Sequence, residues 1–402
     1  MKVLIISSIY INHLLQIYKK HKKLKDSCYE DQYFKIKDEA IASIGEWPDY
    51  FSKIDVECKV ICVNNPIIQE TWCNENYFEP EKENSEFSIV IAQIRKFAPS
   101  HLIVMNPGYL NQDNRFDKLL HFCPSIKRKV CWYGAPSGET SFLKNYDYVL
   151  SPSKNLTEKN LNDGLKCFHL NHAFEPRILD LVGKGKQRKN KMCFIGSLNS
   201  GNEWYNRRIS YLERISKEIE IDIYSDVQKL NYYQRFKHTY ILKRHSLCKV
   251  LLQKNIENKF LLNHSNKNNL PQFDRLASSQ IVKKIKPPRY GLDMLQLLSS
   301  YRFTFNMHIP LSGSSAGNLR VTESLGLGTC LLTDSKTNNS EFLCNYTDIL
   351  SYNTADDCIN KIISLMNNND LVDEIKTVLK ENTLLHHSTS NQFDRLNYII
   401  TK

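Results

Sequence analysis

Short apolar runs alternate with longer amphipathic stretches along the first half of the chain. The runs rich in Val, Ile and Leu, which are typical of buried strands, lie at 3–8, 58–63, 101–105, 129–133 and 148–150. Amphipathic periodicity predicts a helix at 87–97, and Ser153 suits the N-cap of a second helix that runs to residue 161. Strands and helices that alternate at this spacing predict βαβ units and a parallel sheet.

The same alternation starts again after residue 191 and continues to the end of the chain. Strands are expected at 192–195, 221–224, 303–306, 330–333 and 349–352. Helices are expected at 207–219, 292–300, 319–327, 355–367 and 371–382. The restart indicates a second α/β domain of similar, Rossmann-like size.

Polar segments divide the chain between these two alternating regions. The sequence therefore predicts a first domain at 1–182, a basic linker at 183–191 and a second domain at 192–380. An insertion at about 226–286, rich in Asn, Lys, His and Tyr, interrupts the second domain. It could contact a membrane or a partner, or merely cap the sheet. A last helix at 381–402 is expected to pack back on the first domain.

Composition narrows the class of protein. The chain has 402 residues, of which 41% are hydrophobic and 24% charged, so it can bury sizeable cores and is not disordered. No apolar run approaches the roughly 20 residues of a membrane span, and residues 1–6 do not resemble a secretion signal. The twelve cysteines are scattered without a C-x-x-C pair. We therefore expect a soluble cytoplasmic protein with reduced, buried cysteines.

The net charge of +11 suits an anionic partner, such as nucleic acid, an anionic membrane surface or a phosphorylated small molecule. The basic clusters lie far apart, at 19–25, 184–191, 235–254 and 283–289, and they lack the regular aromatic residues of a single-strand platform. Each cluster can equally be a solvated face. We do not expect nucleic-acid binding, whereas peripheral contact with the inner membrane face remains open.

A loop of small residues between an expected strand and an expected helix carries the densest candidate chemistry. The strand ends at Asn306, the Gly- and Ser-rich loop follows, and the helix begins near Asn318. Backbone amides and a helix N-terminus attract anions, and Arg320 adds a cation. Glu323 could accept both hydroxyls of a ribose. The pattern indicates a nucleotide-diphosphate site; the alternatives are a surface i,i+3 ion pair and, for His308, a packed core histidine.

Several runs in this half of the chain resemble the CgeB-like glycosyltransferases of the group 1 type. They lie at 171–176, 194–198, 290–294, 305–309, 318–328, 331–334 and 386–389. Weaker similarity extends to the first half, at 27–32, 47–51 and 92–99. The resemblance implies the GT-B fold, in which two facing Rossmann-like domains with parallel sheets enclose an inter-domain cleft. It also implies that the second domain holds most of a nucleotide-sugar donor, with no metal or other cofactor.

The resemblance assigns roles to particular residues. Glu323 takes the position of the second Glu of the family's E-x7-E motif, which binds the donor ribose. The expected donor-binding set is Asn306, Ser314, Ser315, Asn318, Arg320, Glu323, Ser324, Gly196, Ser197 and Tyr290. His308 is expected close to the donor as a catalytic residue, and Tyr10 and His172 on the acceptor side.

One position departs from the family motif. Ser315 stands where the first Glu of the E-x7-E motif would contact the donor sugar. The resemblance therefore does not imply which sugar is transferred, nor that the configuration of its anomeric carbon is retained. An inverting reaction needs a general base from the first domain, for which His13 is the nearest candidate after the first strand. The alternative for His13 is a solvent-facing helix residue.

The function expected from these features is metal-independent transfer of a hexose-like sugar. The donor is a nucleotide-diphosphate sugar, and the acceptor is a glycan, a lipid-linked saccharide or a protein. Two other interpretations remain open. One is a nucleotide-sugar epimerase on the same fold, and the other, motivated by Ser315, is an inactive saccharide- or partner-binding subunit.

Overall fold

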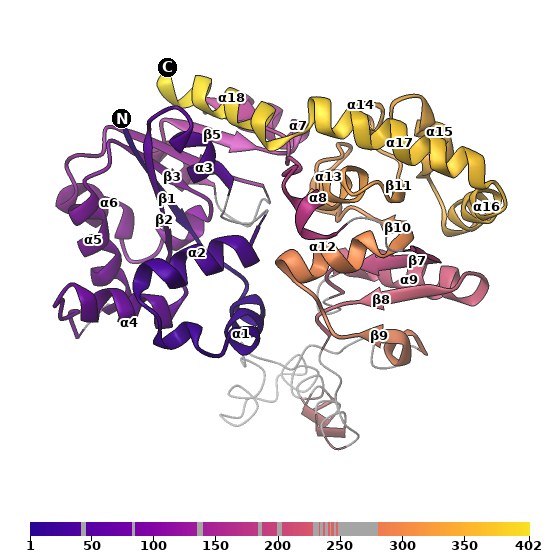
Figure 1. The fold of residues 1–402 in the computed structure, drawn as a ribbon, viewed down its shortest axis with the longest axis horizontal. Helices are drawn as coiled ribbons and strands as arrows, with labels where there is room; N and C mark the ends of the chain where they lie inside the picture. Colours follow the sequence, from indigo (N-terminus) through magenta and orange to yellow (C-terminus); the bar gives the residue numbers. More distant parts are fainter. Residues whose placement is uncertain are drawn as a thin grey trace.

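The computed structural model describes residues 1–41, 46–82, 85–134, 140–183, 187–198, 203–227 and 280–402, together with single helical residues between 233 and 247. It contains two α/β domains that lie side by side, each built on a six-stranded parallel sheet with helices on both faces (Figure 1). This arrangement confirms the fold class expected from the sequence. The expected insertion lies largely outside the described residues.

The first sheet has the strand order β2-β1-β3-β4-β5-β6, and every pair is parallel. Its strands are β1 (Lys2–Ser7), β2 (Glu57–Cys62), β3 (His101–Val104), β4 (Arg128–Trp132), β5 (Tyr148–Ser151) and β6 (Cys167–His169). The five expected strands are confirmed, and β6 was missed. The central strands are covered on both faces, which is why they appear as nearly continuous apolar runs.

Helices cover the two faces of the first sheet. They are α1 (Ile11–Lys20), α2 (Tyr29–Glu39), α3 (Glu46–Ser52), α4 (Pro66–Glu75), α5 (Ser85–Phe97), α6 (Arg115–Phe122), α7 (Lys154–Asn162) and α8 (Ile178–Leu181). Strand β1 shows the alternation: Val3 and Ile5 face one core, and Leu4 and Ile6 face the other. Ser153 caps α7 as expected, because its hydroxyl accepts a hydrogen bond from the amide of Leu156.

The second sheet has the strand order β12-β11-β10-β7-β8-β9 and is also parallel throughout. Its strands are β7 (Lys189–Ile195), β8 (Ile221–Tyr224), β9 (Ile285–Lys286), β10 (Tyr301–Asn306), β11 (Cys330–Asp334) and β12 (Ser351–Tyr352). Its helices are α9 (Glu203–Glu218), α12 (Gly291–Ser299), α13 (Leu319–Gly326), α14 (Ser340–Leu343), α15 (Thr347–Leu350), α16 (Ala355–Met366) and α17 (Asn369–His386).

Three expectations for the second domain need correction. Strand β7 begins at Lys189, inside the expected linker at 183–191. Lys189 pairs with Tyr301, the first residue of β10. Strand β9 lies inside the expected insertion. The expected strand at 349–352 is wrong in its first half, because residues 349 and 350 end helix α15 and only Ser351–Tyr352 pair with β11.

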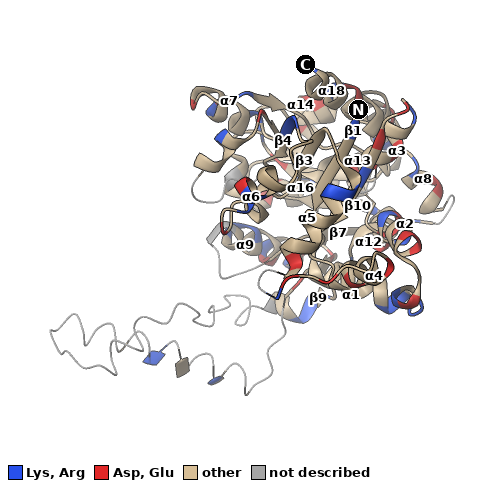
Figure 2. Cartoon of the chain, turned by 90° about the vertical axis from the view of Figure 1, so that its left-hand side faces the viewer, with Lys and Arg blue, Asp and Glu red and all other residues tan. Residues whose placement is uncertain are grey.

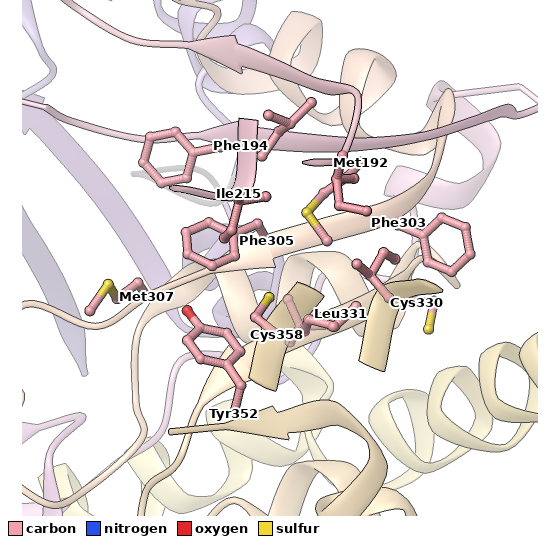
Figure 3. Close-up of a cluster of buried hydrophobic side chains, with 14 of the residues drawn as sticks. Met192, Phe194, Ile215, Phe303, Phe305, Met307, Cys330, Leu331, Tyr352 and Cys358 are labelled. Atoms are coloured by element: carbon pink, nitrogen blue, oxygen red, sulfur yellow. The ribbon is translucent and has the colours of Figure 1, made fainter. Parts of the chain in front are cut away.

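The main core of the second domain lies between its sheet and helices α9 and α16. Figure 3 shows Phe194, Phe303, Phe305 and Tyr352 among the side chains of this core. The rings of Phe305 and Tyr352 stack with centroids 5.4 Å apart. This core holds β7 and β10 side by side, and both strands end at the edge of the sheet that faces the first domain.

The chain crosses between the domains twice, and the two crossings lie against each other. Phe174, on the first crossing, pairs with Ser388 on the second as an isolated parallel bridge. The second crossing leads from α17 into α18 (Thr389–Thr401), and the two helices span both domains (Figure 1). Phe393, Leu396 and Ile400 of α18 are buried in the core of the first domain. The last helix thus packs on the first domain, but it spans Thr389–Thr401 rather than the expected 381–402, because residues 381–386 belong to α17.

Eleven of the cysteines lie in the described part of the chain, and they are unpaired. Most are buried, but Cys28 is exposed, contrary to expectation, and Cys248 lies outside the described residues. Lys and Arg are interspersed with Asp and Glu around the domains rather than gathered on one element (Figure 2). No helix among the described residues is both long enough and apolar enough to span a membrane.

A candidate active site between the domains

Three neighbouring cavities line the boundary between the domains, at the carboxyl ends of both sheets. Their volumes are about 290, 340 and 1300 Å³, and His172 lines all three. The 290 Å³ cavity lies between Pro152 and His172 of the first domain and His308 and Asn318 of the second. We call it the donor cavity because part of the donor-binding set expected from the sequence lines it. The other two are lined mainly by the first domain, and we call them the acceptor cavities after the expectation for Tyr10 and His172. Ligands of parallel α/β sheets bind at this edge.

The Gly/Ser loop and the start of α13 form one wall of the donor cavity. Asn318 donates a hydrogen bond from Nδ2 to Oδ1 of Asn306, 2.8 Å away, and Asn306 in turn donates to the hydroxyl of Thr333. These hydrogen bonds connect Asn318, the residue that precedes α13, to the carboxyl ends of β10 and β11. The Oδ1 atom of Asn318 is buried and has no hydrogen-bond partner among the described residues.

His308 is held from both sides. Its Nδ1 atom lies 2.7 Å from Oδ1 of Asp334, and its backbone amide donates to the same oxygen. The amide of Gly317 points at Nε2 from 3.4 Å. Burial alone would raise the pKa of Asp334, but the hydrogen bonds from His308 and the ammonium of Lys336 hold that pKa below its usual value. An ionised Asp334 favours the His308 tautomer that carries its proton on Nδ1, which leaves Nε2 as an acceptor beside the cavity.

Arg320 and Glu323 form an ion pair one turn along α13. Nη1 of Arg320 lies 2.6 Å from Oε2 of Glu323, and the two side chains are only 17% and 3% exposed. The i,i+3 ion pair considered for these residues therefore exists, but it is buried rather than on the surface. Burial raises the pKa of Glu323, and the charge of Arg320 opposes that rise. Neither residue lines the donor cavity, so the expected ribose contact of Glu323 stays a prediction.

Arg208, on the first turns of α9, supplies a cation that the sequence analysis missed. Its guanidinium donates to the carbonyl of Ser197, 2.9 Å away, and to that of Met307, and it lines the donor cavity. It therefore joins the loops that follow β7 and β10. Burial lowers the pKa of Arg208, but a guanidinium remains charged at neutral pH. The preceding residue, Arg207, donates to Tyr211 instead.

Some of the buried polar atoms without partners lie at this edge of the second sheet and on α13 behind it. Among the described residues, buried side-chain atoms without a hydrogen bond include Oδ1 of Asn318, Nε of Arg208, Nε of Arg320, Oγ of Ser324 and Oγ of Ser225. Buried polar groups are rarely left unsatisfied, because each one costs about 1–3 kcal/mol. The cluster indicates a place where a polar ligand would complete the hydrogen bonding.

The loop residues Ser314 and Ser315 contact the first domain. Ser315 accepts a hydrogen bond from the backbone amide of Asn155, 3.2 Å away, and Ser314 bonds the side chain of Asn155. Gly317 lies so close to the first domain that an added Cβ would sit 2.3 Å from the carbonyl oxygen of Pro152. Ser315 also lines the donor cavity, whereas Ser314 is exposed. The loop is thus both a cavity wall and a contact between domains.

His13 lies at a second contact between the domains rather than in the cavities. It is 4% exposed, so the solvent-facing interpretation is wrong, and its ring stacks on Tyr290 at 5.6 Å. An added Cβ on Gly291 would lie 2.6 Å from its Nε2 atom and 2.0 Å from the carbonyl oxygen of Glu39. Burial lowers the pKa of His13. Its proposed role as a base would therefore require this contact to open.

Tyr10 and His172, which were expected on the acceptor side, both line the cavities next to the first domain. His172 also lines the donor cavity, so a role of either residue in acceptor binding stays a prediction. Tyr10 is 79% exposed and lines both acceptor cavities together with Trp132. His172 packs against Trp132 with ring centroids 5.3 Å apart. Burial lowers the pKa of His172 to about 4, so its imidazole is neutral at physiological pH.

The structure therefore brings together only part of the expected donor set. His308, Ser315 and Asn318 line the donor cavity. Asn306 and Ser197 do not line it, but they accept hydrogen bonds from the lining residues Asn318 and Arg208. The amide of Gly196 donates to the carbonyl of Tyr224. Arg320, Glu323 and Ser324 are buried deeper on α13, and Tyr290 bonds Asp226 near the acceptor side. No group of three or more His, Cys, Asp or Glu residues in the described ranges could hold a metal ion.

A sequence-family model described as glycosyl transferase-like matches residues 246–397, which is less than half of the chain. No curated protein matches the chain. Among solved structures, T4 phage β-glucosyltransferase in complex with UDP-glucose is similar over 100% of this chain and 99% of its own, with a TM-score of 0.52 and 11% identity. A second structure of this T4 phage DNA-modifying enzyme has a TM-score of 0.51 and 12% identity over the same shares. These similarities show that the chain has the GT-B fold.

Proposed function

We propose that the protein is a glycosyltransferase that moves a sugar from a nucleotide diphosphate to a hydroxyl-bearing acceptor. The observation that carries this proposal is the asymmetry of the inter-domain cleft. Its donor cavity combines a guanidinium, the start of α13 and unsatisfied polar atoms, whereas the acceptor cavities combine aromatic rings and amides. The family match in the second domain and the GT-B fold support the same interpretation.

The donor cavity suits a diphosphate. Arg208 would bind its oxygens with Nε, the guanidinium nitrogen that lacks a partner among the described residues. The N-terminus of α13 adds positive potential on the opposite wall. The ribose would extend along α13 toward Glu323. We expect these groups to replace a metal ion in neutralising the leaving group.

The reaction then requires few protein groups. An acceptor hydroxyl oxygen forms a bond to the anomeric carbon, and the bond from that carbon to the diphosphate oxygen breaks. The nucleoside diphosphate leaves with the electron pair, and the hydroxyl proton passes to a base or to the departing phosphate. Fixed positive charge around the departing oxygens lowers the barrier because it needs no reorganisation during the reaction.

An epimerase is a weaker candidate because it needs no second substrate. The acceptor cavity of about 1300 Å³ shares His172 and Gly134 with the donor cavity, and it offers room for a second substrate. A glycan, a lipid-linked saccharide or a protein could each present a hydroxyl there. Unpaired cysteines fit a reducing compartment, so we place the reaction in the cytoplasm.

Nucleotide binding tests the proposal. UDP and GDP should raise the melting temperature of the protein, because a ligand that binds only the native state stabilises it. Arg208→Ala should abolish this shift. Arg214→Ala is the matched control, since Arg214 lies on the same helix but pairs with Glu218 and Asp356 at the surface. A shift that survives Arg208→Ala, or no shift with either nucleotide, would contradict the proposed donor site.

A further inference from the structure

The larger acceptor cavity has an unusual lining for a protein with a net charge of +11. Its polar side chains are mostly amides and a hydroxyl: Ser8, Asn12, Asn64, Asn106, Asn111 and Gln112. Asn106, Asn111 and Gln112 are exposed and follow β3, on the segment that leads to α6. Amides can both donate and accept hydrogen bonds, which matches the two-way bonding of alcohol groups.

Aromatic rings supply the rest of this surface. Trp132, at the end of β4, lines both acceptor cavities and packs against Trp47 and His172, with ring centroids at 6.0 and 5.3 Å. Tyr10 lines both cavities as well and has 79% of its surface exposed. Aromatic rings beside polar groups can pack against the C–H face of a sugar ring.

No Lys or Arg among the described residues lines either acceptor cavity. The nearby guanidinium of Arg115 stacks on the rings of Tyr109 and Phe87 instead, at 4.8 and 5.5 Å. His172 adds no charge, because burial lowers its pKa and keeps its imidazole neutral. The charged side chains that do line these cavities are the acids Asp226, Glu46 and Glu175. The cation that lines the cleft, Arg208, stands on the donor side.

We infer that the acceptor is an uncharged saccharide, bound by the amides of the segment at 106–112 and by the rings of Trp132 and Tyr10. This inference rests on the proposed transferase function and specifies its second substrate. A nucleic acid or another phosphate polymer would need Lys or Arg against its backbone, since phosphate neutralisation supplies most of such binding.

Saturation-transfer NMR with defined oligosaccharides tests the inference. The probes are three neutral compounds, maltopentaose, cellopentaose and chitopentaose, and two anionic ones, pentagalacturonate and a 12-base-pair DNA duplex. The full-length protein should transfer saturation to at least one neutral probe and to neither anionic probe. Nucleotide binding is measured in parallel by the Arg208-dependent thermal shift, so that a failure of the donor site is recognised separately.

Two variants locate the binding. Tyr10→Ala, and Asn106→Lys combined with Gln112→Lys, should each weaken binding of the neutral probe at least tenfold while the UDP shift is unchanged. Asn74→Lys combined with Asn162→Lys adds the same charge at exposed sites outside the cavities and should leave binding unaltered. The inference is overturned if an anionic probe binds in a Tyr10-dependent manner. It is equally overturned if no neutral probe binds at 5 mM, or if the cavity variants bind it as well as the native protein.

Discussion

At the scale of single residues, the ion pair between Arg320 and Glu323 shows how burial changes the meaning of a sequence motif. On an exposed helix such a pair would contribute a few tenths of a kcal/mol. Here the Glu323 side chain is 3% exposed, and the pair lies beside Met294 of α12. Removal of one partner leaves a buried charge without compensation, which costs about 3–5 kcal/mol.

We therefore expect Arg320→Ala to destabilise the protein, and to do so more at high pH. Glu323 already has a raised pKa in the folded state, and loss of Arg320 raises it further. The folded state then binds a proton that the unfolded state has released, so stability falls as pH rises above the ordinary value for Glu. Urea unfolding at pH 5 and pH 8 measures this difference.

The control is the double variant Arg320→Met with Glu323→Gln, which has no charge to bury. Its stability should differ little between the two pH values beyond the change seen in the native protein. If Arg320→Ala were equally stable at pH 5 and pH 8, the ion pair would not be the source of the cost.

The residues of the donor cavity that were predicted from the sequence lie on the loop after β10 and at its end. The Gly/Ser loop after β10 placed His308, Ser315 and Asn318 at the cleft, because a loop that follows a parallel strand must emerge at that edge. Arg208 was missed because nothing in the sequence distinguishes it from Arg207. Only the folded structure brings Arg208 against the carbonyls of Ser197 and Met307, in the segments that follow β7 and β10.

At the scale of elements, helix α7 begins at the boundary between the domains and is capped from both. Ser153 accepts from the amide of Leu156, and Ser315 of the second domain accepts from the amide of Asn155. The first turn of a helix has amides without intrahelical partners. The position that departs from the family motif thus satisfies one of them across the cleft.

Ser315→Ala should remove this cap and destabilise the protein by about 1 kcal/mol, because Asn155 would keep a donor without a partner. Ser314→Ala is the comparison, since Ser314 is exposed and its hydroxyl bonds the side chain of Asn155 rather than a backbone amide of the helix. Chemical denaturation of both variants measures the difference. Equal stabilities would show that the bond across the cleft contributes nothing.

Most strands were predictable because each is covered on both faces and leaves a continuous apolar run. The exceptions have physical causes. Strand β6 spans three residues, Cys167–His169, and β9 spans two, Ile285–Lys286, and both are too short for a pattern. Ile349 and Leu350 look like a strand but end α15, where a short helix turns the chain back toward the sheet.

At the scale of the whole molecule, the two domains are held closed by contacts around the start of α12. Lys20 lies 2.9 Å from Glu39 of its own domain and 2.8 Å from Asp293 of the other. Gln16 donates to the carbonyl of Pro288. Gly291, at a φ of +49°, packs directly on the carbonyl of Glu39. A side chain at residue 291 has no room while the domains touch.

Gly291→Ala should therefore open the cleft and increase the radius of gyration measured by X-ray scattering. Gly164→Ala is the matched control, because Gly164 also has a positive φ, +80°, but no atom lies within 4 Å of the place that an added Cβ would take. Both variants carry the backbone cost of about 1–2 kcal/mol. A radius unchanged in both would show that this contact does not hold the domains together.

The division into two α/β units was predictable from the restart of the alternating pattern, and so was the return of the last helix. The contacts between the domains were not. They join residues such as Lys20 and Asp293, which are 273 positions apart, and ordinary surface composition gives no sign of such pairs.

Helix α18 has a consequence for synthesis on the ribosome. Gln392 on this helix bonds Asn171, 221 positions earlier in the chain. At about 5–20 residues per second, roughly 10–45 s separate the emergence of these two residues during translation. One layer of the first domain remains uncovered for that whole interval. Until α18 has been made, the first domain thus exposes the apolar surface that Phe393, Leu396 and Ile400 later cover, and chaperones can recognise such a surface.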